Sequence, residues 1–154
     1  MVDNIARVAD HEYYMQLAIE QAKQAFINDE IPVGAVLIKN NEVILKSHNQ
    51  TRQLNNPLAH AEMLILNEIQ KTDKYLQDYT LYVTLEQCLM CSGAIILSRL
   101  GTLVFGCHDP KTGVCGSIYN TMTDKHFNHH PALITGIMET ECSNILKEFF
   151  KKKR

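Results

Sequence analysis

The chain has 154 residues, of which 45% are hydrophobic and 21% charged. This length and composition are typical of one globular domain and exclude a disordered or fibrous protein, so we expect a single domain over residues 1–154. Residues 1–10 lack the apolar core of a signal peptide, and no stretch approaches the roughly 20 apolar residues that cross a bilayer. These features favour a cytoplasmic protein without a membrane-spanning segment.

The formal charge is −2 at pH 7, so a nucleic-acid partner would have to be bound by a local basic patch. Lys147 and the tail at residues 151–154 place five of the fifteen lysines and arginines in the last eight positions. Taken alone, this tail is either a nucleic-acid contact or a solvated end that aids solubility.

The first third of the chain predicts a helix and a hairpin. Apolar residues at helical spacing follow Asp10, a candidate N-cap, and predict an amphipathic helix over residues 11–28. The apolar runs 33–38 and 42–45 flank an Asn-Asn pair that tolerates the positive φ angles of a tight turn. We therefore expect these two runs to pair as antiparallel strands.

After a polar loop at residues 49–59, helix-like and strand-like segments alternate. This order is typical of crossover units that place parallel strands in one sheet. The predicted segments are helix 60–69, strand 80–85, helix 88–97, strand 102–106, strand 132–138 and helix 140–152.

Two short motifs point to a metal site. His60 and Glu62 form one, and Cys88 and Cys91 form the other, twenty-six residues after the glutamate. Alone, the first is usually an ordinary surface dipeptide, and the second suits a structural zinc half-site or a redox pair. Together, each at the start of a helix-like segment, they predict one zinc ion per chain held by His60, Cys88 and Cys91.

The ligand count favours catalysis over a structural role. A structural zinc has four protein ligands, whereas three ligands leave the fourth position for water. Glu62 lies two residues from His60, so we expect it beside the metal without ligating it. Its carboxylate can then move protons during hydrolytic removal of an amino group from an aromatic ring.

At this point the chain resembles the cytidine-deaminase-like zinc deaminases, and within them the members that act on adenosine in tRNA. The likeness runs from about residue 11 to residue 150. Its marks are residues 31–36 (IPVGAV), Asn49, residues 59–62 (AHAE), 84–86 (TLE) and 88–94 (CLMCSGA), Ser98 and Arg99, Phe105 and Gly106, residues 109–113 (DPKTG), Asn128 and His129, and Phe149 and Phe150.

The resemblance implies a three-layer α/β/α sandwich around a five-stranded mixed sheet. It also implies a homodimer whose site draws on both subunits. The implied reaction is hydrolytic deamination of adenosine to inosine at the wobble position of a tRNA anticodon stem-loop.

The resemblance also implies substrate contacts. Asn49 would hydrogen-bond the flipped base, Val33 would pack on its face, and the Ala61 backbone would read its edge. Asp109 would accept a hydrogen bond from the ribose 2′-hydroxyl, and Phe150 would stack on a loop base. From the residues alone, Asn49 and Asp109 also suit turns, and the Phe149–Phe150 pair also suits the core.

The sequence departs from the family pattern at one position. The family usually has proline immediately before the first cysteine, where this chain has Gln87. Because proline fixes φ at a helix start, we expect a slightly looser loop with the ligands kept. Three other cysteines, Cys107, Cys115 and Cys142, match no ligand position of the family, and we expect them to be buried or incidental thiols. Three histidines, His126, His129 and His130, are a weak candidate for a second metal site.

Two alternatives remain open from the sequence. A deaminase of free cytosine, cytidine or guanine would use the same metal ligands with a different pocket. A non-catalytic RNA-binding module would hold a structural zinc with a fourth protein ligand.

Overall fold

The computed structural model describes residues 4–154, so the first three residues of the predicted domain lie outside the described part of the chain. Five strands form one sheet in the order β2-β1-β3-β4-β5. Strand β1 (Gly34–Lys39) pairs antiparallel with both β2 (Glu42–His48) and β3 (Tyr79–Leu85). Strand β4 (Thr102–Cys107) runs parallel to β3 and to β5 (Ala132–Thr135). The sheet is therefore mixed, as expected.

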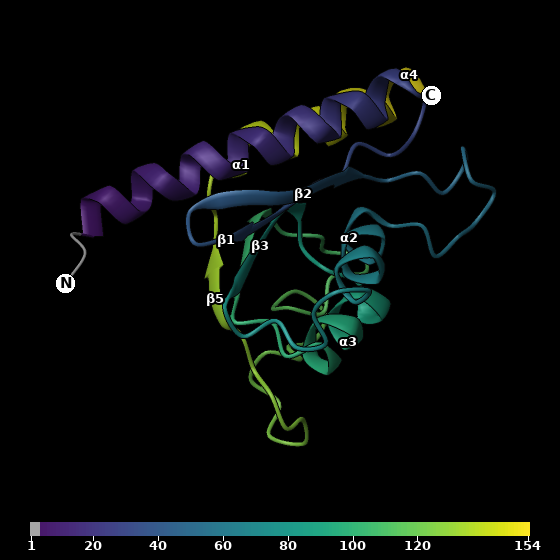
Figure 1. The fold of residues 1–154 in the computed structure, drawn as a ribbon. Helices are drawn as coiled ribbons and strands as arrows, with labels where there is room; N and C mark the ends of the chain where they lie inside the picture. Colours follow the sequence, from purple (N-terminus) through teal and green to yellow (C-terminus); the bar gives the residue numbers. More distant parts are fainter. Residues whose placement is uncertain (1–3) are drawn as a thin grey trace.

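Two helices cover each face of the sheet (Figure 1). On one face α1 (Asn4–Ile27) lies beside α4 (Glu139–Lys152). On the other face lie α2 (Ala61–Ile69) and α3 (Leu89–Leu97). The predicted three-layer α/β/α sandwich is confirmed.

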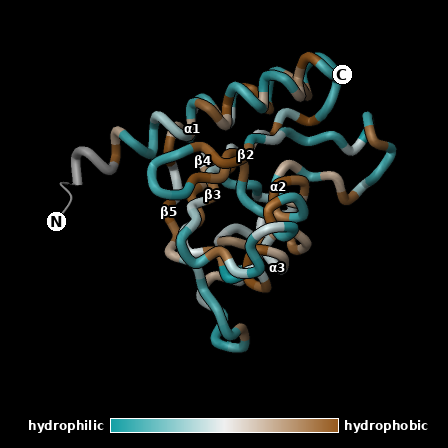
Figure 2. The backbone as a smooth tube through the Cα atoms, viewed as in Figure 1, coloured by the Kyte–Doolittle hydropathy of each residue, from teal (hydrophilic) through white to brown (hydrophobic). Residues whose placement is uncertain are grey.

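Alternate residues of each central strand enter opposite halves of the core. Leu81 and Val83 of β3 pack toward α2 and α3, whereas Tyr82 packs toward α1 and α4. This alternation follows from the two-residue repeat of a strand. Figure 2 shows the result as hydrophobic central strands and more hydrophilic outer turns. No helix within residues 4–154 has the length and apolar character needed to span a bilayer.

The predicted hairpin is confirmed at its turn. Asn40 and Asn41 have φ angles of 51° and 61°, the left-handed values that a tight two-residue turn requires. The β1–β2 pairing shifts register between Leu37 and Ile38, so the antiparallel ladder contains an irregularity that sequence patterning did not predict.

Three predicted element ends are wrong, and one of them is in β2, which continues to His48 instead of ending at residue 45. The first helix begins at Asn4, which puts Asp10 inside α1 instead of at its N-cap. The apolar stripe marks only the part of the helix that packs on the sheet, and Figure 1 shows the first turns extending beyond it. Strand β5 ends at Thr135, not at residue 138, because Gly136 and Met138 take positive φ angles of 82° and 54° that turn the chain into α4.

Gly34, the first residue of β1, lies where the strand packs closely against α1. A Cβ at Gly34 would lie 1.9 Å from the Ala18 carbonyl oxygen and 2.5 Å from the Ala22 nitrogen. These are backbone atoms that cannot move away alone, so we expect Gly34→Ala to lower the free energy of unfolding by at least about 1–3 kcal/mol.

The matched control for Gly34 is Gly93 in α3. A Cβ there meets no atom of the chain within 4 Å. Because glycine disfavours helix interiors, Gly93→Ala should raise the free energy of unfolding of the monomer by about 0.5–1 kcal/mol. Urea titration measures both, and equal stability of Gly34→Ala and the parent chain would contradict the close packing.

Candidate active site

The starts of α2 and α3 bring together the three predicted metal ligands. His60 immediately precedes α2 and Cys88 immediately precedes α3, and both have extended backbones. Cys91 lies in the first turn of α3. The His60 Nδ1 atom lies 3.6 Å from Cys88 Sγ and 3.5 Å from Cys91 Sγ, and the three ligand atoms all lie within 4.8 Å of one another.

These separations fit one tetrahedral metal ion. A nitrogen about 2.0–2.1 Å and a sulfur about 2.3 Å from a shared zinc ion would lie about 3.6 Å apart at tetrahedral angles. The observed nitrogen–sulfur separations agree with this value. Within residues 4–154, no other group of three or more His, Cys, Asp or Glu side chains converges in this way.

The cluster favours a thiolate even before a metal is bound. A hydrogen bond from Cys91 lowers the pKa of Cys88 to about 4. The same hydrogen bond between the two cysteines raises the pKa of Cys91. The hydrogen bond between His60 and Cys88 raises the pKa of His60. A thiolate is the form of cysteine that binds metals, so the site is prepared for a cation.

Glu62 lies in the first turn of α2, close to this cluster. Its side chain is only 4% exposed, and burial raises the pKa of its carboxyl to about 7. A carboxyl with a pKa near neutrality can both accept and donate a proton at physiological pH. Glu62 therefore has the burial and the pKa that suit a general acid–base, and its role in proton transfer stays a prediction.

A cavity of about 810 Å³ opens beside the cluster and collects every substrate-contact residue predicted from the sequence. It is lined by His60, Glu62 and Cys88 and by the predicted contacts Val33, Asn49, Ala61, Asp109 and Phe150. A second hollow of about 470 Å³ shares part of this lining, including Lys147, Phe150 and Arg154. The cavity therefore continues along α4.

Asn49 presents an unmatched acceptor on the cavity wall. Its Nδ2 group donates to the Ile31 carbonyl at 3.3 Å, and its backbone N–H donates to the Val33 carbonyl at 3.0 Å. Its Oδ1 atom is buried and has no hydrogen-bond partner in the part of the chain that the structure describes. A buried acceptor of this kind is costly unless a ligand supplies the donor.

Asp109 fulfils the turn role that the sequence left open. Its carboxylate accepts hydrogen bonds from the Lys111 and Thr112 backbones at 3.0 Å and 3.3 Å, and from the Thr112 hydroxyl at 2.7 Å. The side chain thus closes its own turn while lining the cavity. Its contact with a ribose stays a prediction.

The two C-terminal phenylalanines divide between core and cavity. Phe149 is 6% exposed and packs edge-on against Phe26 of α1, with ring centroids 5.7 Å apart. Phe150 is 45% exposed and lines the cavity. Only Phe150 is therefore available to a ligand.

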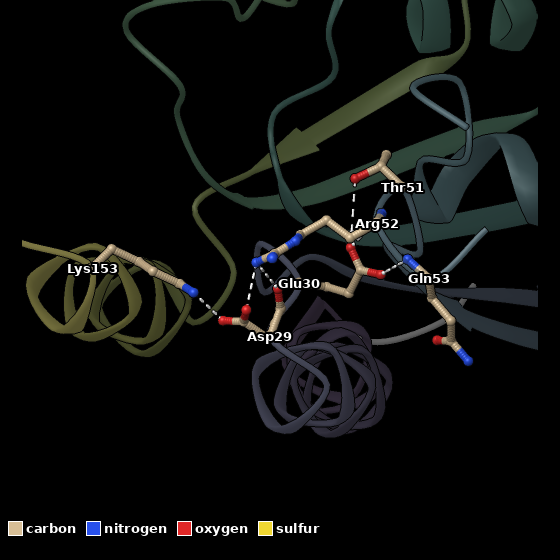
Figure 3. A network of polar contacts seen from close by, with 6 residues as sticks. All are labelled: Asp29, Glu30, Thr51, Arg52, Gln53 and Lys153. Atoms are coloured by element: carbon tan, nitrogen blue, oxygen red, sulfur yellow. Dashed lines mark hydrogen bonds and ion pairs between the residues drawn. The ribbon is translucent and has the colours of Figure 1, made fainter. Parts of the chain in front are cut away.

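The basic tail packs against the rest of the protein more closely than the sequence suggested. Helix α4 continues to Lys152, whose ammonium lies 4.9 Å from the centre of the Phe26 ring. Lys153 pairs with Asp29 at the end of α1 (Figure 3). Residues 151–154 all remain exposed, so these contacts orient two tail side chains on the surface and both interpretations of the tail stay open.

Gln87 is buried at the position where the family usually has proline, and the looser loop expected there stays a prediction. Its side chain is fully buried, and its Nε2 group donates to the Leu85 carbonyl at 3.1 Å. Its carbonyl also accepts from the Val114 backbone at 3.0 Å. The hydrogen bonds and packing of Gln87 thus hold the segment that leads into Cys88.

The other cysteines and histidines form no second cluster in the described chain. Cys107, Cys115 and Cys142 are buried, and burial raises the pKa of each thiol to about 11, 11 and 12 respectively. The histidines near residue 128 bond separately: His126 to the Asp124 carboxylate, His130 to the Asp124 carbonyl and His129 to the Leu100 carbonyl. They lie in a loop and not on a helix.

Sequence reasoning missed two buried carboxylates that hold the loops around the cavity. One is Glu86, which lines the cavity, and the other is Glu30, which lies just before its Ile31 wall. The Glu30 carboxylate accepts from the Arg52 and Gln53 backbones at 3.0 Å and 2.7 Å (Figure 3). In the sequence, each of these glutamates is visible as a charged residue between two apolar segments. The sequence did not reveal which groups would hydrogen-bond to it.

The comparisons with known proteins agree with this arrangement. A model of the MafB19-like deaminase family matches residues 9–154. The tRNA-specific adenosine deaminases of Bacillus subtilis (strain 168) and Aquifex aeolicus (strain VF5) are each 43% identical to the chain over 145 residues. These alignments cover 93% of the chain and 90% and 95% of the two relatives. The chain belongs to the tRNA-specific adenosine deaminase family.

Solved structures support the fold of this deaminase. One comes from a study of A-to-I editing by tRNA:A34 deaminases at the wobble position of transfer RNA. It is 38% identical, with a TM-score of 0.83 over 87% of the deaminase and 99% of that chain. A guanine deaminase from Nitrosomonas europaea has a TM-score of 0.78 at 21% identity, over 90% of the deaminase and 83% of that chain. This second likeness shows the shared fold alone.

The thiol chemistry of the deaminase gives a testable pH dependence. In the metal-free protein, iodoacetamide should modify Cys88 first, at a rate nearly constant between about pH 6 and about pH 8. A thiol with a pKa of about 4 is already thiolate throughout that range, whereas a thiol with a raised pKa gains about tenfold in thiolate per pH unit.

Peptide mass spectrometry identifies the modified residue, and Cys88→Ala removes the fast reaction as a control. Prior addition of zinc should also protect Cys88. Modification of Cys107 or Cys115 ahead of Cys88 would contradict the assignment of the thiolate.

Proposed function

We propose that residues 1–154 form a single deaminase domain that hydrolyses adenosine to inosine at the wobble position of a tRNA anticodon. The observation that carries this proposal is the joining of the His60–Cys88–Cys91 cluster, Glu62 and the unpartnered Asn49 acceptor in one cavity. The 43% identity to tRNA-specific adenosine deaminases supports adenosine over the bases of the sister enzymes.

Zinc suits the donor set better than a harder cation does. Two thiolates and one imidazole match the ligands that zinc prefers, while magnesium and calcium prefer oxygen. A zinc ion bound by His60, Cys88 and Cys91 would supply a Lewis acid that lowers the pKa of water from about 15.7 to about 7. The three ligands without a fourth also favour a catalytic role over the structural zinc of a binding module.

Glu62 supplies the proton transfers. It accepts a proton from the water that adds to C6 of adenine, and it delivers protons to the ring nitrogen and to the departing amino group. A C6–O bond forms and the C6–N bond breaks, so one water is consumed and one ammonia is released. The pKa of about 7 lets one carboxyl act in both directions.

The cavity walls orient the nucleotide. Asn49 Oδ1 can accept a hydrogen bond from the base, Val33 offers an apolar surface to its face, and the Ala61 backbone lies at its edge. Asp109 faces the ribose and Phe150 stacks on a neighbouring base. The negative net charge makes the local basic residues Lys111, Lys147 and Arg154 the natural contacts for phosphates.

We also propose a homodimer formed through the outer side of α3. Leu89 and Leu97 are 70% and 80% exposed, and Leu58, in the loop that precedes α2, is 58% exposed. Large apolar residues that are exposed favour association, because their burial removes apolar surface from water.

Replacement of Glu62 separates proton transfer from metal binding. Glu62→Ala should keep about one zinc per chain and lose at least about 10²–10⁴ in rate, which is the range for a positioned acid–base. Cys91→Ala, the matched control, should release the metal and lower the melting temperature. Elemental analysis measures the zinc, and its loss from Glu62→Ala would make Glu62 a ligand.

Incubation with an anticodon stem-loop tests the substrate. We expect inosine at one adenosine of the loop, little turnover of free adenosine or cytidine, and slower reaction when the target ribose is replaced by deoxyribose. Binding should weaken as salt rises, because phosphate contacts release counterions. Efficient deamination of free cytidine or guanine, with the stem-loop intact, would assign the chain to a sister activity.

The contribution of the basic residues that line the cavity is best tested with single replacements. Deletion of residues 151–154 would also remove the last turn of α4 and the Lys153–Asp29 pair. Lys147→Ala should instead flatten the salt slope by up to about 0.7–0.9 for each phosphate that Lys147 neutralises. Lys23→Ala on the exposed side of α1 serves as its control.

A further inference from the structure

Glu86 is a buried acidic residue with no part in the proton transfers assigned above. It follows β3 directly, two residues before Cys88, and its side chain is 3% exposed. A buried carboxylate is retained only where several donors stabilise it. Its partners therefore indicate its role.

All four donors to Glu86 come from the loop that follows β4. The Oε1 atom accepts the Asp109 N–H at 2.9 Å and the Ser117 hydroxyl. The Oε2 atom accepts the Cys115 and Ser117 N–H groups at 2.9 Å and 3.0 Å. Asp109 and Ser117 are eight positions apart in the sequence. One carboxylate thus holds both ends of the segment at residues 109–117 within this loop.

The loop fits closely around the carboxylate. A Cβ at Gly113 would lie 2.3 Å from Glu86 Cδ and 2.6 Å from the Asp109 carbonyl oxygen. Only a glycine can approach a buried side chain and the backbone so closely. Glu86 therefore lies at the centre of the 109–117 segment and shapes it, together with the bond from the Val114 N–H to the Gln87 carbonyl at 3.0 Å.

The side chain of Asp109 cannot replace this anchor. Its carboxylate bonds only to Lys111 and Thr112, which belong to the same turn. The turn is internally ordered, but the Glu86 carboxylate fixes the Asp109 backbone relative to β3 and the nearby Cys88. The position of Asp109 on the cavity wall therefore depends on Glu86.

We propose that Glu86 is a positioning residue for recognition of the target ribose, acting through Asp109. The proposal rests on the proposed function, in which Asp109 faces the ribose. It requires that loss of Glu86 raise KM more than it lowers kcat and reduce the preference for ribose over deoxyribose at the target. A purely structural carboxylate would change stability without changing that preference.

The test compares Glu86→Gln and Ser117→Ala with Glu30→Gln. Gln keeps the shape of Glu86 but turns an NH₂ group toward N–H donors, whereas Ser117→Ala removes one of the four donors from an exposed residue. Glu30→Gln is the matched control, because Glu30 is equally buried and accepts two backbone N–H groups from the loop at residues 51–53.

The readouts are kcat and KM on stem-loops with adenosine or deoxyadenosine at the target, together with melting temperature. We expect Glu86→Gln to raise KM about tenfold or more and to reduce the ribose preference at least about threefold. Ser117→Ala should also raise KM and reduce the ribose preference, but by smaller factors. Glu30→Gln should lower the melting temperature with the preference unchanged.

An unchanged preference in Ser117→Ala and in any folded Glu86→Gln would overturn the proposal, and Ser117→Ala alone decides if Glu86→Gln fails to fold. A parent enzyme that does not prefer ribose over deoxyribose would also overturn the proposal, because Asp109 would then not recognise the ribose. A parent enzyme that makes no inosine would overturn the proposed function instead.

In that case, amide hydrogen exchange tests the anchoring of the loop by Glu86. Exchange at residues 109–117 should be faster in Ser117→Ala than in the parent chain. Unchanged exchange would overturn the anchoring role of Glu86.

Discussion

The active site depends on the packing of two short helices against the same face of one sheet. Helices α2 and α3 contact each other, and each begins just after a residue with an extended backbone. His60 and Cys88 occupy these two positions, so the ligand atoms meet only when both helices are docked. Residues that keep the helices docked, such as Ile65 and Ile95 in the shared core, therefore support the metal cluster without being ligands.

Two buried carboxylates extend this order to the cavity walls. Glu30 holds the loop that follows Asn49, and Glu86 holds the loop that contains Asp109. Each accepts at least two backbone N–H groups, and such groups are costly to leave unpaired in the interior. The two loops thus gain fixed positions without regular secondary structure, which suits a cavity that must recognise one nucleotide.

The opposite face of the sheet links the cavity to the C-terminus. Helix α4 packs beside α1, where Phe149 meets Phe26 and Lys153 pairs with Asp29. This packing leaves Phe150 and Lys147 on the cavity side of the helix. The basic end of the chain is therefore held near the site as part of the fold.

The alternation of elements, the hairpin at Asn40 and Asn41, and the cluster of His60, Cys88 and Cys91 with Glu62 could be predicted from local periodicity, turn chemistry and the spacing of short motifs, which are visible along the chain. The substrate-contact residues of the cavity could be predicted only from the resemblance to the family. The start of α1, the end of β5 and the burial of Phe149 and Gln87 emerged only in the folded chain. So did the partners of Glu30 and Glu86, because these hydrogen bonds join residues more than twenty positions apart, and no local pattern encodes which distant N–H a buried carboxylate will meet.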